Sequence, residues 1–151
     1  MAVFQGKSVL VTGGSRGIGR GIALRFAELG AAKVAISYLR NDTAAEETAG
    51  EIRERGAEAQ LLRGNVGVPE KAVALLEEAG PLDVLVSNAA TGVIRPALEL
   101  EERHWDWTMN ANARALLDLA QASARGCARA SPRGSGSARA HRSRRPRRRR
   151  R

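Results

Sequence analysis

Cysteine, tyrosine and long apolar runs are scarce in this sequence. The only cysteine is Cys127 and the only tyrosine is Tyr38. A single cysteine excludes an internal disulfide and a zinc site built from cysteine pairs, and we expect no metal. The sequence has no run of about 18 apolar residues, and its N-terminus lacks the basic-then-apolar pattern of a signal peptide. We therefore expect a cytoplasmic protein with no membrane partner.

Acidic residues are absent from the C-terminal part of the chain, where every position after Asp118 is neutral or basic. The net charge of +9 is therefore the sum of two unlike segments, which carry −3 over 1–122 and +12 over 123–151. The segment 123–151 also lacks Val, Ile, Leu, Met and aromatic residues. Such a segment buries too little apolar surface to offset the entropy of ordering. We expect a folded domain at 1–122 and a disordered basic tail at 123–151.

The arginines of this tail would give non-specific, salt-sensitive affinity for nucleic acid. A nucleic-acid-binding module is thus an alternative function, but the tail has no aromatic residue to stack on bases, so this partner is disfavoured. The tail holds no lysine and consists mostly of Arg, Ala, Ser, Gly and Pro, which have GC-rich codons. This composition favours a truncated or frame-shifted product, translated out of frame.

A glycine-rich turn is the most informative feature of the chain. Residues 12–19 read Thr-Gly-Gly-Ser-Arg-Gly-Ile-Gly, after an apolar run at 8–11 and before an amphipathic run. Glycines at a strand-to-helix turn let the backbone approach a pyrophosphate, and the first free helical amides then face the anion. The turn predicts a dinucleotide-binding unit. Its candidate cofactor contacts are Gly13, Ser15, Arg16, Gly17, Ile18 and Gly19.

Apolar runs alternate with helical patterns over the first 122 residues. Strands are expected over 7–12, 33–38, 59–63 and 82–87. Helices are expected over 18–29, from a Thr43–Glu46 capping box onward, over 69–80, and over about 104–122, with His104 at the helix start. This alternation predicts an α/β fold, a partial Rossmann domain in which right-handed crossovers give a doubly wound parallel sheet of strand order 3-2-1-4.

Three helices carry stripes that should face the core. The expected stripes are Ile18, Ile22, Phe26 and Leu29; Ala45, Thr48, Ala49 and Ile52; and Trp105, Met109, Asn112, Leu116 and Leu119. Asn112 is the one polar residue of the last stripe. A buried amide must be hydrogen-bonded, which makes Asn112 a candidate functional residue, with a satisfied core asparagine as the alternative.

Two arginines indicate the form of the cofactor. NAD-binding folds place a carboxylate about 20 residues past the glycines, whereas the corresponding stretch here, 37–40, has none. Arg16 and Arg40 would instead meet a 2′-phosphate, so the sequence favours NADP(H). Asp42 is assigned to the start of the following helix. Further candidates are Asn65 and Val66 beside an adenine ring, and Asn88 and Ala89 at the end of the fourth strand.

Together these residues resemble the short-chain dehydrogenase/reductase family over about residues 3–122. Thr12-Gly-x-x-x-Gly17-x-Gly19 matches its cofactor motif, and Ser87-Asn88-Ala89-Ala90 matches its Asn-Asn-Ala-Gly motif with changes at both ends. The stretch 87–117 is most similar to NADPH-dependent enoyl-[acyl-carrier-protein] reductase III, although 3-oxoacyl reductases and sugar dehydrogenases share much of the pattern. The resemblance implies a reductase of fatty-acid synthesis with an acyl-carrier-protein-linked or other small-molecule substrate.

The resemblance also identifies residues that this chain lacks. Asn112 falls at the catalytic asparagine of the family, whereas no match exists for its catalytic serine, tyrosine and lysine. Tyr38 lies in the wrong part of the fold, and no lysine follows Lys71. Without the tyrosine that donates the proton, we expect this chain to be inactive as a reductase. An unpaired apolar fourth strand would also favour self-association.

Overall fold

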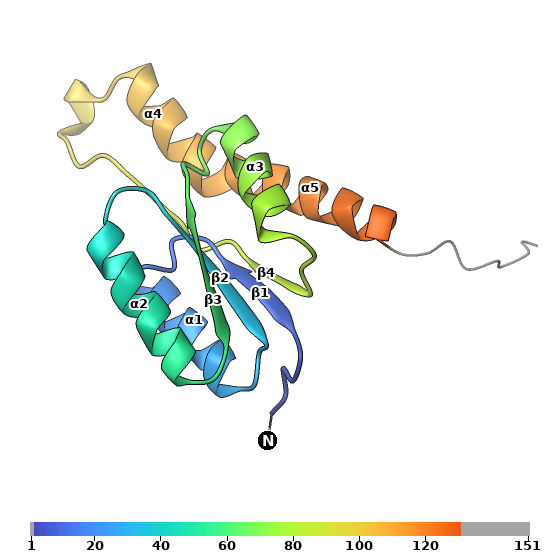
Figure 1. Ribbon diagram of the computed structural model, residues 1–151. Helices are drawn as coiled ribbons and strands as arrows, with labels where there is room; N and C mark the ends of the chain where they lie inside the picture. The colour runs from blue at the N-terminus through green and yellow to red at the C-terminus, as the bar shows by residue number, and fades with distance from the viewer. Residues whose placement is uncertain (1, 131–151) are drawn as a thin grey trace, which may run out of the picture.

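The computed structural model describes residues 2–130. Four strands alternate with helices, as the sequence predicts (Figure 1). The strands are β1 Ser8–Val11, β2 Lys33–Tyr38, β3 Glu58–Arg63 and β4 Val84–Val86. The helices are α1 Gly17–Glu28, α2 Asp42–Glu54, α3 Pro69–Ala79, α4 Glu102–Met109 and α5 Ala115–Ala130, with a short 3-10 turn at Ala97–Glu99 and a π-helical turn, η2, at Asn110–Arg114.

The strands form one parallel sheet of order β3-β2-β1-β4, which confirms the predicted topology. Helices α1 and α2 lie on one face, and α3 and α5 lie on the other (Figure 1). Because neighbouring residues of a strand point to opposite faces, β1 contributes to two cores. Val9 and Val11 pack with α1 and α2, whereas Leu10 packs with α3 and α5. Because all four strands are parallel, their carboxyl ends meet at one edge of the sheet.

In helix α1 the predicted residues Ile22 and Phe26 pack against the core but are only partly buried, and smaller residues are buried completely. Its buried residues are Gly19, Ala23 and Ala27, while Ile18 is 78% exposed, so the predicted stripe was wrong at its start. The reason is that α1 begins in the glycine turn, where its backbone at Gly19 lies against Gly13, after β1, and Asn88, after β4. Only small residues fit between elements that approach so closely.

Helix α2 buries the predicted stripe of Ala45, Thr48, Ala49 and Ile52. Its N-cap, however, is Asn41 rather than Thr43. The side-chain Oδ1 of Asn41 accepts a hydrogen bond from the backbone N of Ala44 at 3.0 Å. Asparagine caps helices at least as well as threonine, so the sequence offered two competing start signals.

The last predicted helix is interrupted and longer than expected. The π-helical turn η2 separates α4 from α5, and α5 continues to Ala130, so the predicted helix end at Ala122 was wrong. Alanine and arginine are strong helix formers, which explains the continuation. The predicted tail beyond residue 130 lies outside the described residues. At the start of α4, the backbone N of Glu101 donates to Nδ1 of His104 at 3.0 Å, which confirms the helix-start role of His104.

The predicted stripe of the last helices is confirmed at Leu119 and wrong at Trp105, Met109, Asn112 and Leu116. Ala111, Ala115 and Leu119 are buried, whereas Trp105 is 68% exposed and Leu116 is 53% exposed. Ala115 and Leu119 pack in the core beneath α3. The periodic pattern predicted that the large apolar residues would face the core. Helix α5 packs so closely on α3, however, that alanine fills most of the contact.

Asp83 joins the starts of β1 and β4, and we expect Asp83→Asn to weaken the fold in a pH-dependent way. Its carboxylate accepts hydrogen bonds from Lys7 Nζ at 2.8 Å and from the backbone N of Ser8 at 2.9 Å. These two bonds, that from Lys7 first, hold the pKa of Asp83 below its ordinary value. Because the folded-state pKa is the lower one, the stabilisation is complete above about pH 4 and disappears as the pH falls through the folded-state pKa.

Urea unfolding measured from neutral to acidic pH tests this expectation. Wild type should exceed Asp83→Asn in stability at neutral pH, and the difference should vanish in acid. The exposed Asp106, which has no ion-pair partner among residues 2–126, provides the control variant Asp106→Asn. A stability difference for Asp83→Asn that does not change with pH would show that its charge is irrelevant.

Candidate functional site

A cleft of about 760 Å³ opens at the carboxyl ends of the four strands. In parallel sheets this edge is where ligands bind. The turn after β1, the segment after β2, the residues after β3 and those after β4 each contribute to its wall. Nine of the predicted cofactor residues line it: Gly13, Ser15, Arg16, Gly17, Arg40, Asn65, Val66, Asn88 and Ala89. Ile18 and Gly19 do not.

The glycines of the turn serve different purposes. Gly13 and Gly17 have φ values of 65° and 56°, which favour glycine. A Cβ at Gly13 would lie 2.9 Å from Cα of Ala89, and a Cβ at Gly19 would collide with the carbonyl oxygen of Gly13. A Cβ at Gly17, by contrast, would meet nothing within 4 Å. Gly19 therefore permits the fold, whereas Gly17 keeps open the space beside the first turn of α1.

A hydrogen-bond cluster ties the end of β1 to the segment after β4. The fully buried Thr12 accepts through Oγ1 from the backbone N of Asn88 and of Ala89, each at 3.0 Å, and donates to Val86 O at 3.3 Å. Asn88 Nδ2 donates to the carbonyl oxygens of Thr12 at 3.0 Å and of Gly13 at 3.3 Å. The predicted candidate Asn88 thus acts on the backbone of the glycine turn.

Two further side chains hold the turn, and sequence reasoning did not assign them this role. Ser37, at the end of β2, accepts through Oγ from the backbone N of Gly13 at 3.3 Å. Thr48, in α2, donates through Oγ1 to the carbonyl oxygen of Ser15 at 3.0 Å. Both residues are buried, and a buried hydroxyl within an apolar pattern was the signal that a bond existed. The hydrogen-bond partner of each hydroxyl could not be predicted from the sequence, because it depends on the tertiary fold.

Positive charge lines one end of the cleft. Arg16, the N-cap of α1, and Arg40, after β2, both face it, and neither has an ion-pair partner within the described part of the chain. Tyr38 lies beside them, and burial together with the nearby carboxylate of Asp42 raises its pKa. Asp42 begins α2, as expected, and does not line the cleft. This end of the cleft can receive an anion.

Asn65 forms the turn after β3. Its Oδ1 accepts from the backbone N of Gly67 at 2.9 Å, which is the ordinary behaviour of an asparagine in a turn. The side chain nevertheless lines the cleft together with Val66, which is buried. These two residues therefore form the part of the cleft wall that follows the edge strand β3.

Asn112 is exposed and lies in the π-helical turn η2, so the predicted buried amide was wrong. Both polar atoms of its side-chain amide are nevertheless hydrogen-bonded. Its Oδ1 accepts from the backbone N of Thr91 at 2.8 Å, and its Nδ2 donates to the carbonyl oxygen of Thr91 at 2.8 Å. Thr91 lines the cleft and Asn112 does not. The amide therefore positions the segment after β4 from outside the cleft.

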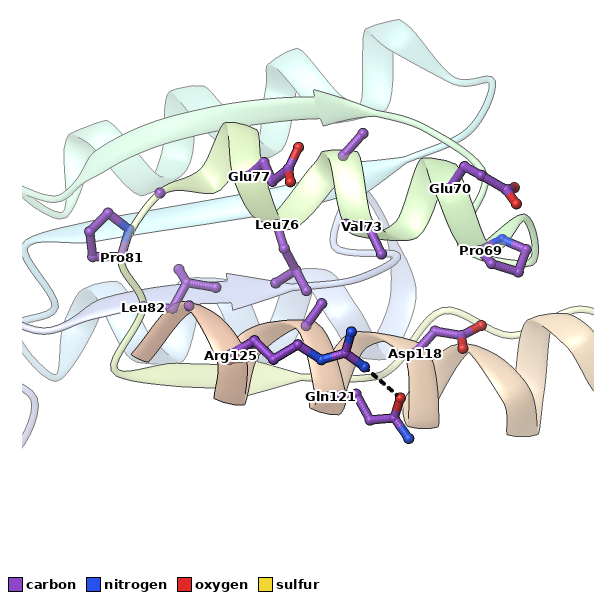
Figure 2. Close-up of a pocket in the computed structure, with 15 residues that line it drawn as sticks. Pro69, Glu70, Val73, Leu76, Glu77, Pro81, Leu82, Asp118, Gln121 and Arg125 are labelled. Carbon is purple, nitrogen blue, oxygen red and sulfur yellow. Dashed lines mark hydrogen bonds between the residues drawn. The ribbon is translucent and has the colours of Figure 1, made fainter. Parts of the chain in front are cut away.

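A second cavity, of about 820 Å³, lies between α3 and α5 (Figure 2). It contains none of the predicted cofactor residues. Apolar side chains such as Val73, Leu76 and Leu82 alternate there with Glu70 and Glu77. No glycine turn, strand terminus or cluster of arginines converges on it, so we place the functional site in the cleft at the strand ends.

Residues 2–126, whose side chains the structure describes, contain neither a membrane span nor a metal centre. No helix there has the length and apolar character needed to cross a bilayer. The same part of the chain holds no group of three or more His, Cys, Asp or Glu side chains arranged to bind a metal ion.

Comparison with known proteins gives one family and several relatives. Residues 7–135 match the model of the short chain dehydrogenase family. Hydroxynaphthalene reductase-like protein Arp2 of Metarhizium anisopliae is 39% identical over 120 residues, which are 77% of this chain and 45% of that protein. The 3-oxoacyl-[acyl-carrier-protein] reductase FabG of Staphylococcus aureus is 36% identical over 119 residues, 76% of this chain and 48% of that protein.

A solved structure shows the same architecture with a ligand bound. The crystal structure of a short chain dehydrogenase from Burkholderia cenocepacia, in complex with NADP, superposes with a TM-score of 0.76 at 37% identity. The match covers 82% of this chain and 51% of that one. This chain thus spans about half the length of the relatives that it matches.

Proposed function

This chain belongs to the short-chain dehydrogenase family, and from that premise we propose that its cleft binds NADP(H). The observation that carries the proposal is a glycine turn at the strand ends beside two arginines that have no carboxylate partner within residues 2–130. The open space over Gly17 fits a group that needs close approach of the backbone. The NADP complex of the Burkholderia cenocepacia relative supports the same choice.

Each wall of the cleft has a proposed role. The turn of Gly13, Ser15, Arg16, Gly17, Ile18 and Gly19 would receive the pyrophosphate, with Ile18 and Gly19 acting through the backbone of α1. Arg16 and Arg40 would pair with the 2′-phosphate, because guanidinium groups bind phosphate through charge-assisted hydrogen bonds. Asn65 and Val66 would border the adenine. Asn88 and Ala89 would border the nicotinamide end.

The family activity is oxidoreduction, and we propose an acyl thioester linked to an acyl-carrier protein as the substrate of a family member that also carries the catalytic tyrosine, which this chain lacks. The bound nicotinamide would supply or accept a hydride. The similarity of residues 87–117 to enoyl reductases suggests reduction of an enoyl thioester. Reduction of a 3-oxoacyl thioester is the second candidate, favoured by the 36% identity to FabG. Asn112, through Thr91, would shape the segment that borders the reacting end.

The cofactor proposal predicts a preference for NADPH over NADH that depends on Arg40. Arg40→Gln should weaken NADPH binding about tenfold, the effect of losing one charge-assisted bond of about 1.4 kcal/mol, and should leave NADH binding unchanged. Titration of the purified chain with each nucleotide, followed by nucleotide fluorescence, measures both dissociation constants.

Arg53→Gln is the matched control for this titration. Arg53 is an exposed arginine of α2 outside the cleft, and its loss changes the net charge equally. Equal affinity of the wild-type chain for NADPH and NADH would refute the proposed preference. An equal loss in the Arg53→Gln variant would assign the effect to net charge.

A further inference from the structure

An ion pair stands directly behind the arginine-lined end of the cleft. Asp42 is the first residue of α2, next to Asn41, which lines the cleft. Arg63 is the last residue of β3, next to Gly64, which also lines it. Arg63 Nη1 lies 3.4 Å from Asp42 Oδ1, while neither residue itself lines the cleft.

The surrounding backbone holds this pair in place. Arg63 is the register partner of Tyr38 in the sheet, and the backbone N of Gly64 donates to the carbonyl oxygen of Tyr38 at 2.9 Å. Asp42 is fixed by the capped start of α2. Tyr38 lines the cleft, and its raised pKa reports its burial first and the Asp42 carboxylate beside it second. Three residues that line the cleft are therefore immediate neighbours of the ion pair: Asn41 and Gly64 along the chain, and Tyr38 across the sheet.

Asp42 presents a problem for a cleft that binds a phosphate. It lies two positions after Arg40, and an unpaired carboxylate there would repel a 2′-phosphate dianion and attract Arg40. A carboxylate near this place is also the feature by which such folds select a free ribose hydroxyl. Pairing with a guanidinium replaces the negative charge with a dipole, whose field falls off more steeply with distance.

We infer that Arg63 determines cofactor specificity from outside the cleft, by pairing with Asp42 and so making the neighbouring site acceptable to a ribose 2′-phosphate. The inference rests on the proposed binding of NADP(H). In this arrangement Arg16 and Arg40 are the groups that meet the phosphate, and Arg63 neutralises the Asp42 carboxylate, which is placed to oppose them. Arg63 is thus a positioning and screening residue that does not contact the ligand.

A double-mutant cycle tests the inference. Arg63→Gln should raise the dissociation constant of NADPH about three- to tenfold and leave that of NADH unchanged, because NADH carries no 2′-phosphate. Asp42→Asn alone should leave NADPH binding as tight as in wild type or tighter. The double variant, which has no carboxylate to screen, should return to within about twofold of wild type. The loss in Arg63→Gln should shrink at high salt, because both groups are more than half exposed.

Two controls separate screening from folding. Arg63→Lys keeps the charge and should keep the preference. Arg25→Gln breaks an exposed ion pair with Glu28 near the end of α1, where no residue lines the cleft, and should change neither dissociation constant. Thermal unfolding of each variant monitors the fold.

The possible outcomes distinguish a failure of this inference from a failure of the proposed NADP(H) binding. A wild-type preference for NADPH that survives Arg63→Gln contradicts the inference alone. A double variant that keeps the full loss also contradicts it, because Arg63 would then contact the phosphate itself. A wild-type chain without a preference for NADPH contradicts both the inference and the proposed cofactor.

Discussion

Replacing Gly19 by alanine should destabilise the fold by about 3 kcal/mol or more, because overpacking that displaces backbone is among the costliest core changes. A Cβ at this position would collide with the carbonyl oxygen of Gly13 and lie 2.5 Å from Asn88 Nδ2. Gly13 belongs to the backbone of the glycine turn, which is itself fixed by bonds from three sides and cannot yield. Chemical denaturation followed by circular dichroism measures the loss.

Gly21→Ala is the matched control for this substitution. Gly21 lies one half-turn further along α1, is exposed, and a Cβ there would meet nothing within 4 Å. Alanine is the better helix former, so this variant should gain about 0.5–1 kcal/mol. Equal stability of the two variants would show that α1 does not lie as close to the turn as described.

Thr12→Val should cost about 2–4 kcal/mol, although it nearly preserves the shape of the side chain. The hydroxyl of Thr12 satisfies the backbone amides of Asn88 and Ala89 and donates to Val86 O. Valine leaves the two amides without their partner, whereas Val86 O keeps its bond from the backbone N of residue 12, and unsatisfied buried polar groups cost about 1–3 kcal/mol each. The unfolding free energy and the affinity for NADPH should fall together, because the same bonds position the segment after β4.

Thr12→Ser separates the hydroxyl from the methyl group. Serine keeps the three hydrogen bonds and loses one buried methyl, which is worth about 1 kcal/mol. Thr12→Ser should therefore be clearly more stable than Thr12→Val. The reverse order would mean that packing of the methyl group, and not hydrogen bonding, maintains the junction between β1 and β4.

The layout of the sheet could be predicted from the sequence because its signals are local. Apolar strands, the proline at the start of α3 and the stripe of α2 each depend on a few neighbouring residues, and right-handed crossovers then fix the order of the strands. The location of the cleft followed, because the glycine turn and Asn88 both come directly after strands that lie side by side. Nine of the predicted cofactor residues accordingly share one cleft.

The predictions that failed depend on how closely two elements approach. Helical periodicity assumes that the largest apolar residues face the core, yet Ile18 and Leu116 are exposed where glycine or alanine forms the contact. Asn112 was placed in the core by the same assumption, and its bonds to Thr91 depend on the path of the chain between them. A single sequence contains no measure of these distances.

The glycine turn has a consequence for the order in which this chain folds. Its side-chain anchors are Ser37, Thr48 and Asn88, which bond residues 24, 33 and 75 or 76 positions away in the sequence. Contacts between distant residues form only after the entropy of closing long loops has been overcome. The residues of the turn are contiguous, yet the turn reaches its final shape only when β2, α2 and the segment after β4 have all docked. A bound nucleotide would therefore report the completion of folding, even though the residues proposed to contact its pyrophosphate are among the first to be synthesised.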